Sequence, residues 1–173
     1  MKIRLEGTHF IYLEYPFEHI GPGVLNPIAA TDIQEYLPNR KPMELVTKTQ
    51  EVLFIREEDT PAWIAWGNSM GIPSSNRLDL WALLNEPFLD TVFSQEKQEQ
   101  SFARLAENGL DRKEVLGIRQ KVQSQMLMYN TVLWEWVHLG HYDVLLSRKK
   151  YSLQRLSQSF YQWSMGIGLR NRV

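Results

Sequence analysis

A chain of 173 residues, 43% hydrophobic and 23% charged, has the composition of a folded globular domain, which excludes an intrinsically disordered protein. A formal net charge of −1 argues against a dedicated nucleic-acid-binding domain, which is usually basic as a whole. The absence of cysteine excludes disulfides, thiolate metal sites and a cysteine nucleophile, so any catalysis would depend on His, Ser, Lys or carboxylate side chains.

The first third of the chain is typical of strands and loops. In KIRLEGTHFIYLEYPF, apolar residues occupy odd positions from Ile3 to Phe17, which is the period of a half-buried strand, and Gly7 is expected to bend it or form a hairpin turn. A short helix is expected after Asp32, where Glu35 completes a capping-box pattern. The segment EVLFIREEDTPAWIAWG has two β-rich runs around a charged break and predicts a further hairpin.

A connector rich in Gly, Pro and Ser, NSMGIPSSN, leads into the helical part of the chain. We expect Ser75 or Asn76 to cap the first long helix. Pro87 interrupts its apolar period and suits the first turn of a new helix, so we expect a break at Asn85 or Glu86.

The longest predicted helix begins at a capping box of Asp111 and Glu114, after a polar helix that Ser94 caps and Gly109 ends. Its core-facing stripe consists of Val115, Ile118, Val122, Met126, Tyr129, Leu133 and Trp136. In its second half the flanks are apolar too, which indicates a central helix or a subunit interface. We expect Gly140 to end or bend it.

A last helix is expected within YSLQRLSQSFYQW, with Gly166 as its stop. Leu153, Leu156, Phe160 and Trp163 are predicted to share its apolar face.

These patterns predict an α+β protein in which a small N-terminal antiparallel sheet of three to four strands precedes a predominantly helical C-terminal bundle. We expect a single domain over residues 1–173, with a strand and loop subregion at 1–70 and a helical subregion at 76–166.

The segment LWEWVHLGHYD contains a candidate metal site. Glu135 and His138 form an E-x-x-H pair, which places a carboxylate and an imidazole on one helical face, and His141 adds a third ligand if the helix continues. The helix row that contains this pair is mostly polar, so a solvent-facing row or a hydrogen-bonded seam is the favoured interpretation.

The letters GNSMG match a nucleophile elbow around Ser69, after a predicted strand. Three residues from Gly71 to Pro73 follow before any helix, and no parallel α/β alternation surrounds the match. We therefore interpret it as a loop turn.

Charge is distributed unevenly along the chain. Residues 144–173 contain six of the 19 bases and no acid, whereas residues 1–143 contain the other thirteen bases and all 20 acids. The basic cluster consists of Arg148, Lys149, Lys150 and Arg155. Such a cluster suits nucleic-acid phosphates, a protein partner, or the acidic remainder of this chain or of a second copy.

The favoured function is a non-enzymatic protein–protein interaction or regulatory module, with a protein partner or self-association as a homodimer through the apolar long helix. We predict no catalytic residue and no cofactor. One alternative is a nucleic-acid-binding accessory protein that uses the basic cluster, and another is a metal-dependent enzyme centred on Glu135, His138 and His141. The N-terminus lacks the features of a signal peptide and the most apolar window is interrupted by polar residues, so we expect a cytoplasmic protein without a membrane span.

Overall fold

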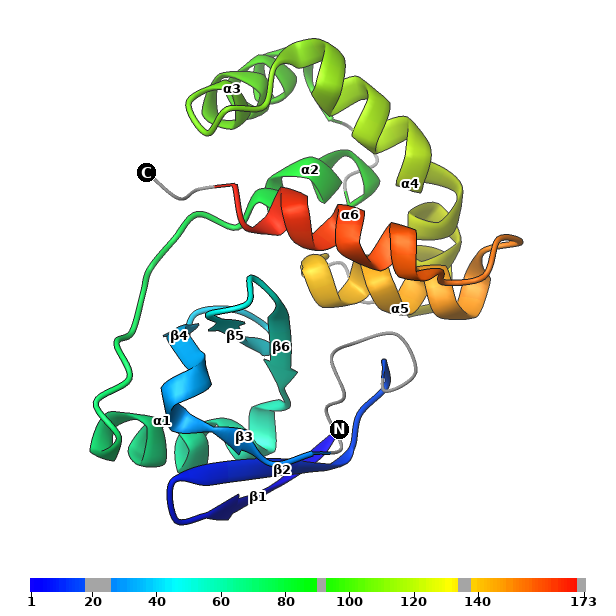
Figure 1. Cartoon of the computed structure of the whole chain (residues 1–173). Helices are drawn as coiled ribbons and strands as arrows, with labels where there is room; N and C mark the ends of the chain where they lie inside the picture. The colour runs from blue at the N-terminus through cyan, green and yellow to red at the C-terminus, as the bar shows by residue number, and fades with distance from the viewer. Residues whose placement is uncertain (18–25, 90–92, 134–137, 171–173) are drawn as a thin grey trace. The chain divides into compact units, whose positions relative to one another are not determined.

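The computed structural model describes residues 1–17, 26–89, 93–133 and 138–170 (Figure 1). The chain forms two compact units, Met1–Arg77 and Leu78–Val173. In the described residues, the first unit contains two three-stranded antiparallel sheets and a helix, and the second contains helices only. This architecture confirms the predicted α+β class.

The first sheet begins with a hairpin of β1 (Lys2–Glu6) and β2 (His9–Glu14). Gly7 lies in the turn with a φ of +57°, a left-handed conformation that glycine adopts without steric cost. The short strand β3 (Ile28–Ala29) pairs with β2 and gives the order β1-β2-β3. The hairpin prediction is therefore confirmed.

The buried face of β2 is not the one that the odd-numbered pattern predicts. Phe10 and Tyr12 are 0% and 1% exposed, whereas Leu13 is 43% exposed. Alternation shows that a strand has two faces, but the larger aromatic rings take the interior here because they bury more apolar area. The Tyr12 hydroxyl donates to the Phe54 carbonyl oxygen at 2.8 Å, so its polar end is satisfied inside the core.

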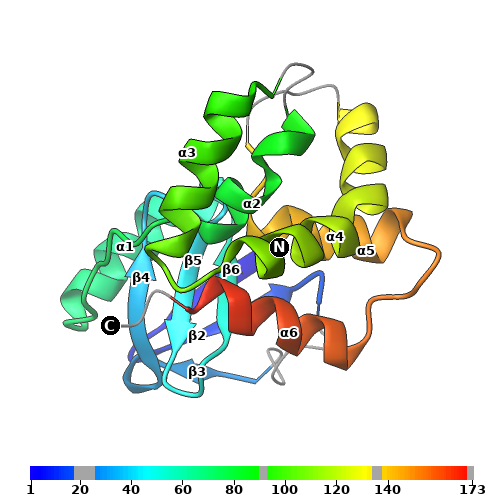
Figure 2. The same ribbon diagram turned by 90° about the horizontal axis from the view of Figure 1, so that it is seen from above.

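The second sheet contains β4 (Ile33–Leu37), β5 (Met43–Thr47) and β6 (Val52–Ile55), which run side by side in that order (Figure 2). Strand β4 occupies the place of the short helix predicted after Asp32, so that prediction is wrong. The capping-box letters specify local hydrogen bonds only, and the pairing of β4 with β5 overrides them.

The predicted hairpin of residues 51–67 is half wrong, because its second run forms helix α1 (Thr60–Ser69) instead of a strand. Pro61 lies in the first turn, where its missing N–H costs no helical hydrogen bond. Trp63 is fully buried. Its ring packs directly on Gly67, because a Cβ added at position 67 would lie only 2.7 Å from a ring carbon. Trp66 donates from its indole nitrogen to the Gly7 carbonyl at 2.7 Å. Trp63 and Trp66 are three residues apart, a spacing that places both side chains on one side of a helix.

The second unit begins with α2 (Leu80–Leu89), whose start and course both differ from the prediction. Asp79, and not Ser75 or Asn76, caps the helix by accepting a hydrogen bond from the Ala82 backbone at 2.9 Å. The predicted break at Asn85 or Glu86 is absent, because the helix continues through Pro87.

Arg119 explains how α2 tolerates Pro87. A proline has no N–H to donate to the carbonyl four residues earlier, which is that of Leu83. Arg119 donates from Nη2 to the Leu83 oxygen at 3.2 Å and from Nε to the Leu84 oxygen at 3.0 Å. Ser101 also donates to the Leu83 oxygen, at 3.4 Å, so distant side chains replace the missing local hydrogen bond, and Arg119 provides the shorter contact.

The next two helices begin at their predicted caps. Ser94 accepts a hydrogen bond from Lys97 at the start of α3 (Gln95–Ala106), and Asp111 accepts one from Glu114 at the start of α4 (Arg112–Leu133). Gly109 lies between them with a φ of +77°. In the described structure, five residues of the predicted stripe are buried: Val115, Ile118, Val122, Met126 and Tyr129.

The last part of the chain contains two helices, α5 (His141–Tyr151) and α6 (Gln158–Gly168). Gly140 precedes α5 instead of ending α4, and Gly166 lies inside α6. Leu153 belongs to the connection between the helices and is fully exposed, so its predicted place on an apolar helix face is wrong. Within the described ranges, no helix combines the length and apolarity that crossing a bilayer requires.

Candidate functional site

A polar cluster surrounds the start of α5. His138 Nε2 lies 3.5 Å from Oδ2 of Asp79, the residue that caps α2 through its other oxygen. Asp143 accepts hydrogen bonds from the Gly140 backbone at 2.8 Å and from the Tyr129 hydroxyl at 3.0 Å. The cluster therefore connects the starts of α2 and α5 with the second half of α4.

Burial dominates the electrostatics of this cluster. It raises the pKa of Asp143 to about 6, although the hydrogen bonds from Gly140 and Tyr129 act in the opposite direction. Burial also raises the pKa of Tyr129, with the Asp143 charge adding to the effect. The Tyr129 phenol is therefore a hydrogen-bond donor throughout the physiological pH range.

His141 has a different environment from His138. It is 2% exposed, and its ring stacks on Trp81 with a centroid distance of 5.9 Å and an interplanar angle of 18°. Its Nε2 lies 3.1 Å from the Ser164 hydroxyl. These contacts are those of a packed core residue.

The predicted metal set depends on a continuous helical face that the structure does not have. Residues 138–140 are not helical, and His141 starts a separate helix. Glu135 lies outside the described residues. Among the residues whose placement is described, no group of three or more His, Asp or Glu is arranged to hold a metal ion.

Ser69 does not occupy a nucleophile elbow. It is the last residue of α1, so the strand that should precede such an elbow is a helix. Its hydroxyl donates to the Trp66 carbonyl at 2.7 Å on the surface.

The structure separates the basic cluster into one inward residue and three outward ones. Arg148 is 9% exposed, its guanidinium lies 4.5 Å from the centre of the Phe160 ring, and it donates hydrogen bonds to Gln125 and Gln154. Arg148 thus has a structural role that its sequence context did not indicate.

The three outward cations lie on and beside the connection between α5 and α6. Lys149 and Lys150 are exposed in the last turn of α5, and Arg155 is exposed in the connection. Lys121 of α4 was missed by the sequence analysis, since it lies 27 residues before the cluster. Its Nζ is 3.7 Å from the centre of the Trp163 ring, a cation–π contact on α6.

Helix α4 carries an exposed apolar patch on its last two turns. Leu127, Met128 and Val132 are 45%, 55% and 58% exposed. The predicted apolar flank of this helix is therefore uncovered within the described structure. We call these three residues the α4 patch.

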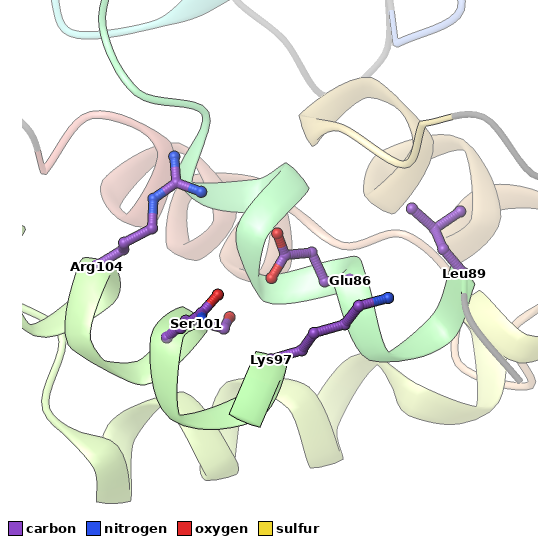
Figure 3. Close-up of a pocket in the computed structure, with 6 residues that line it drawn as sticks. Glu86, Leu89, Lys97, Ser101 and Arg104 are labelled. Atoms are coloured by element: carbon purple, nitrogen blue, oxygen red, sulfur yellow. The ribbon is translucent and has the colours of Figure 1, made fainter. Parts of the chain in front are cut away.

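A pocket of about 350 Å³ lies between α2 and α3. Figure 3 shows its lining side chains, which are Glu86, Leu89, Lys97, Gln100, Ser101 and Arg104. The lining combines one carboxylate with two cations, a mixture that favours neither an anionic nor a cationic ligand. Arg119 donates to the Ser101 hydroxyl at 2.9 Å, so Ser101 belongs to the support of α2.

A second pocket, of about 330 Å³, lies in the first unit. Among its lining residues are Asp32, Lys48, Glu51 and Leu53. Burial raises the pKa of Glu51, but the mixed lining indicates no particular chemistry.

In comparisons with known proteins, no family model, curated protein or solved structure matches the chain. The fold and surfaces define an α+β protein with a sheet unit and a helical unit.

Proposed function

We propose that this protein is a non-enzymatic interaction module that self-associates through the α4 patch. The observation that carries the proposal is the exposure of Leu127, Met128 and Val132 on one helix end. Contiguous exposed apolar residues mark interaction sites more often than scattered ones do.

The geometry of the α4 patch suits a helix–helix contact. Met128 and Val132 are four residues apart, and Leu127 and Thr131 form a parallel pair beside them. The Thr131 hydroxyl donates to the Leu127 carbonyl at 2.8 Å, so this polar group is already satisfied by its own helix. Methionine adapts its shape to a partner surface.

The charge distribution favours a second copy of the chain as the partner. No charged residue occurs from Val122 to Leu133. In a twofold contact each patch meets its own copy, so any charge in it would face a like charge. A charge-free patch avoids this repulsion and resembles the core of an interface.

The environment of the polar cluster supports a structural role and not a catalytic one. Asp143 is engaged with Tyr129 and Gly140, and His141 lies against Trp81 and beside Ser164.

Light scattering over a hundredfold range of micromolar concentrations tests the proposal. The wild type is expected to show a mass near twice 20.3 kDa at the upper end and to dissociate on dilution. Met128→Glu with Val132→Glu should be monomeric throughout, because four carboxylates would meet at the twofold contact. Leu13→Glu is the matched control, since Leu13 is 43% exposed but lies on β2.

A mass of 20.3 kDa across the whole range would show that the α4 patch does not drive self-association. Circular dichroism of each variant separates a lost interface from a lost fold.

A further inference from the structure

The connection between α5 and α6, residues 152–157, presents Leu153 to solvent. Its relative exposure of 106% is the highest among the exposed large hydrophobic residues of the described structure. A single exposed leucine is common on protein surfaces, so its meaning depends on its neighbours.

The neighbours of Leu153 in the chain are cationic. Lys149, Lys150 and Arg155 are all exposed and lie within four residues of it. No acid occurs anywhere from Val144 to the last residue. This surface therefore suits an extended negative partner.

The connection is held in place by its own hydrogen bonds. Arg148 of α5 donates a hydrogen bond to the side-chain oxygen of Gln154. The Gln154 backbone N–H donates to the Ser152 hydroxyl at 3.2 Å. The Tyr151 ring packs against Tyr129 of α4 at a centroid distance of 5.8 Å. The leucine is thus presented by an anchored loop.

We infer that residues 149–155 bind the surface of an anionic membrane. Leu153 enters the boundary between headgroups and acyl chains, and Lys149, Lys150 and Arg155 contact the lipid phosphates and carboxylates. This activity goes beyond self-association, because it uses residues outside the α4 patch.

The central position of a leucine distinguishes a membrane from the other negative partners. Proteins that bind single-stranded nucleic acid stack aromatic rings on the bases, and the connection of residues 152–157 contains no aromatic residue. A protein interface would surround its apolar anchor with a contiguous apolar core, whereas Leu153 stands among cations. An apolar tip beside cations matches the layering of a bilayer surface.

The attachment is expected to be reversible, because one leucine and three cations constitute a small contact. Both parts are required. Each cation near an anionic surface contributes about fivefold to partitioning, and burial of the leucine contributes about tenfold or more.

Cosedimentation of the full chain with vesicles tests the inference. We expect binding to vesicles of phosphatidylcholine with phosphatidylserine and little binding to phosphatidylcholine alone. Lys149→Gln with Lys150→Gln should weaken binding about 25-fold, and Leu153→Ser about tenfold. Leu13→Ser, on β2, should bind as the wild type does.

A second readout uses the absence of cysteine from the chain. Leu153→Cys provides a unique attachment point for an environment-sensitive fluorophore, and Leu13→Cys provides the matched control. The label at position 153 should shift to the blue with anionic vesicles, and the label at position 13 should not.

Absence of binding to anionic vesicles at low salt would overturn the inference. So would binding that Leu153→Ser leaves unchanged. Tight binding of single-stranded RNA or duplex DNA, with equal affinity for wild type and Leu153→Ser, would identify the cations as a nucleic-acid surface instead.

Discussion

Asp143 is a carboxylic acid whose protonation differs between the folded and unfolded chain. Its pKa is raised by burial to about 6 in the folded protein, while an unfolded aspartate titrates near its ordinary value of 3.8. The folded state therefore holds the proton more tightly. The Asp143 carboxyl group therefore contributes least to stability at a pH where it is ionised in both the folded and the unfolded chain.

The pH dependence of stability follows from that difference. As the pH rises from about 4 to about 7, the Asp143 contribution should lower the free energy of unfolding, by at most about 3 kcal/mol. Asp143→Asn removes the titration, so urea unfolding should show the variant gaining relative to the wild type over this interval. A difference between Asp143→Asn and wild type that does not vary with pH would contradict the prediction.

His138 is a second residue whose role can be measured. It is a third exposed, and its contact with Asp79 is 3.5 Å long. His138→Ala should therefore change the free energy of unfolding by less than about 1 kcal/mol. Elemental analysis of the wild type should detect no stoichiometric metal. One bound equivalent of iron, manganese or zinc that disappears in the variant would instead support the metal-site alternative.

At the scale of elements, local signals identified several boundaries. Ser94 and Asp111 start α3 and α4 because an N-cap hydrogen bond involves only residues three apart. Gly7 was predicted to bend a strand or form a hairpin turn and Gly109 to end a helix, and both have positive φ angles. Such features depend on near neighbours and can be read from the sequence.

The sequence predicted the wrong secondary structure where tertiary packing opposed the local conformational preference of the residues. The run AWIAWG is rich in residues that favour strands, yet it forms α1, because Trp63 and Trp66 on one helical side both pack near Phe10. The continuation of α2 through Pro87 likewise depends on Arg119, which is 32 residues away.

The role of Arg119 in α2 gives a third prediction. Arg119→Met should lower the free energy of unfolding by about 2–3 kcal/mol, because the Leu83 and Leu84 carbonyls lose a charged donor inside the protein. Pro87→Ala restores a backbone N–H opposite Leu83, so it should recover part of this loss in the double variant. A double-mutant cycle by urea unfolding measures the coupling.

An Arg119→Met cost that is the same with and without the Pro87→Ala substitution would show that the arginine does not replace the missing hydrogen bond. Arg112→Gln is the control for loss of an arginine, since Arg112 pairs with Glu99 on the exposed surface and should matter little.

At the scale of the whole molecule, self-association should couple to stability. If two copies bind only when folded, mass action raises the midpoint of thermal unfolding as protein concentration increases. The wild type should show this increase, and Met128→Glu with Val132→Glu should not. A midpoint independent of concentration for both proteins would argue against a dimer.

The sequence predicted that the flanks of α4 are apolar and that they lie at the centre of the fold or in a subunit interface. The sequence shows that Leu127, Met128 and Val132 lie off the core stripe. Only the fold shows that the described helices leave them exposed, because coverage depends on how neighbouring helices are placed.

The α+β class, the strands of the first hairpin, the start of α4 and the buried stripe of that helix could all be predicted from the sequence. These follow from periodicity, turns and caps, whose physical range is a few residues. Three other features follow only from packing: Phe10 and not Leu13 faces the core, Arg148 turns inward onto Phe160, and Leu153 is exposed to solvent. Each of these depends on how separate elements pack against one another, which neither composition nor spacing encodes.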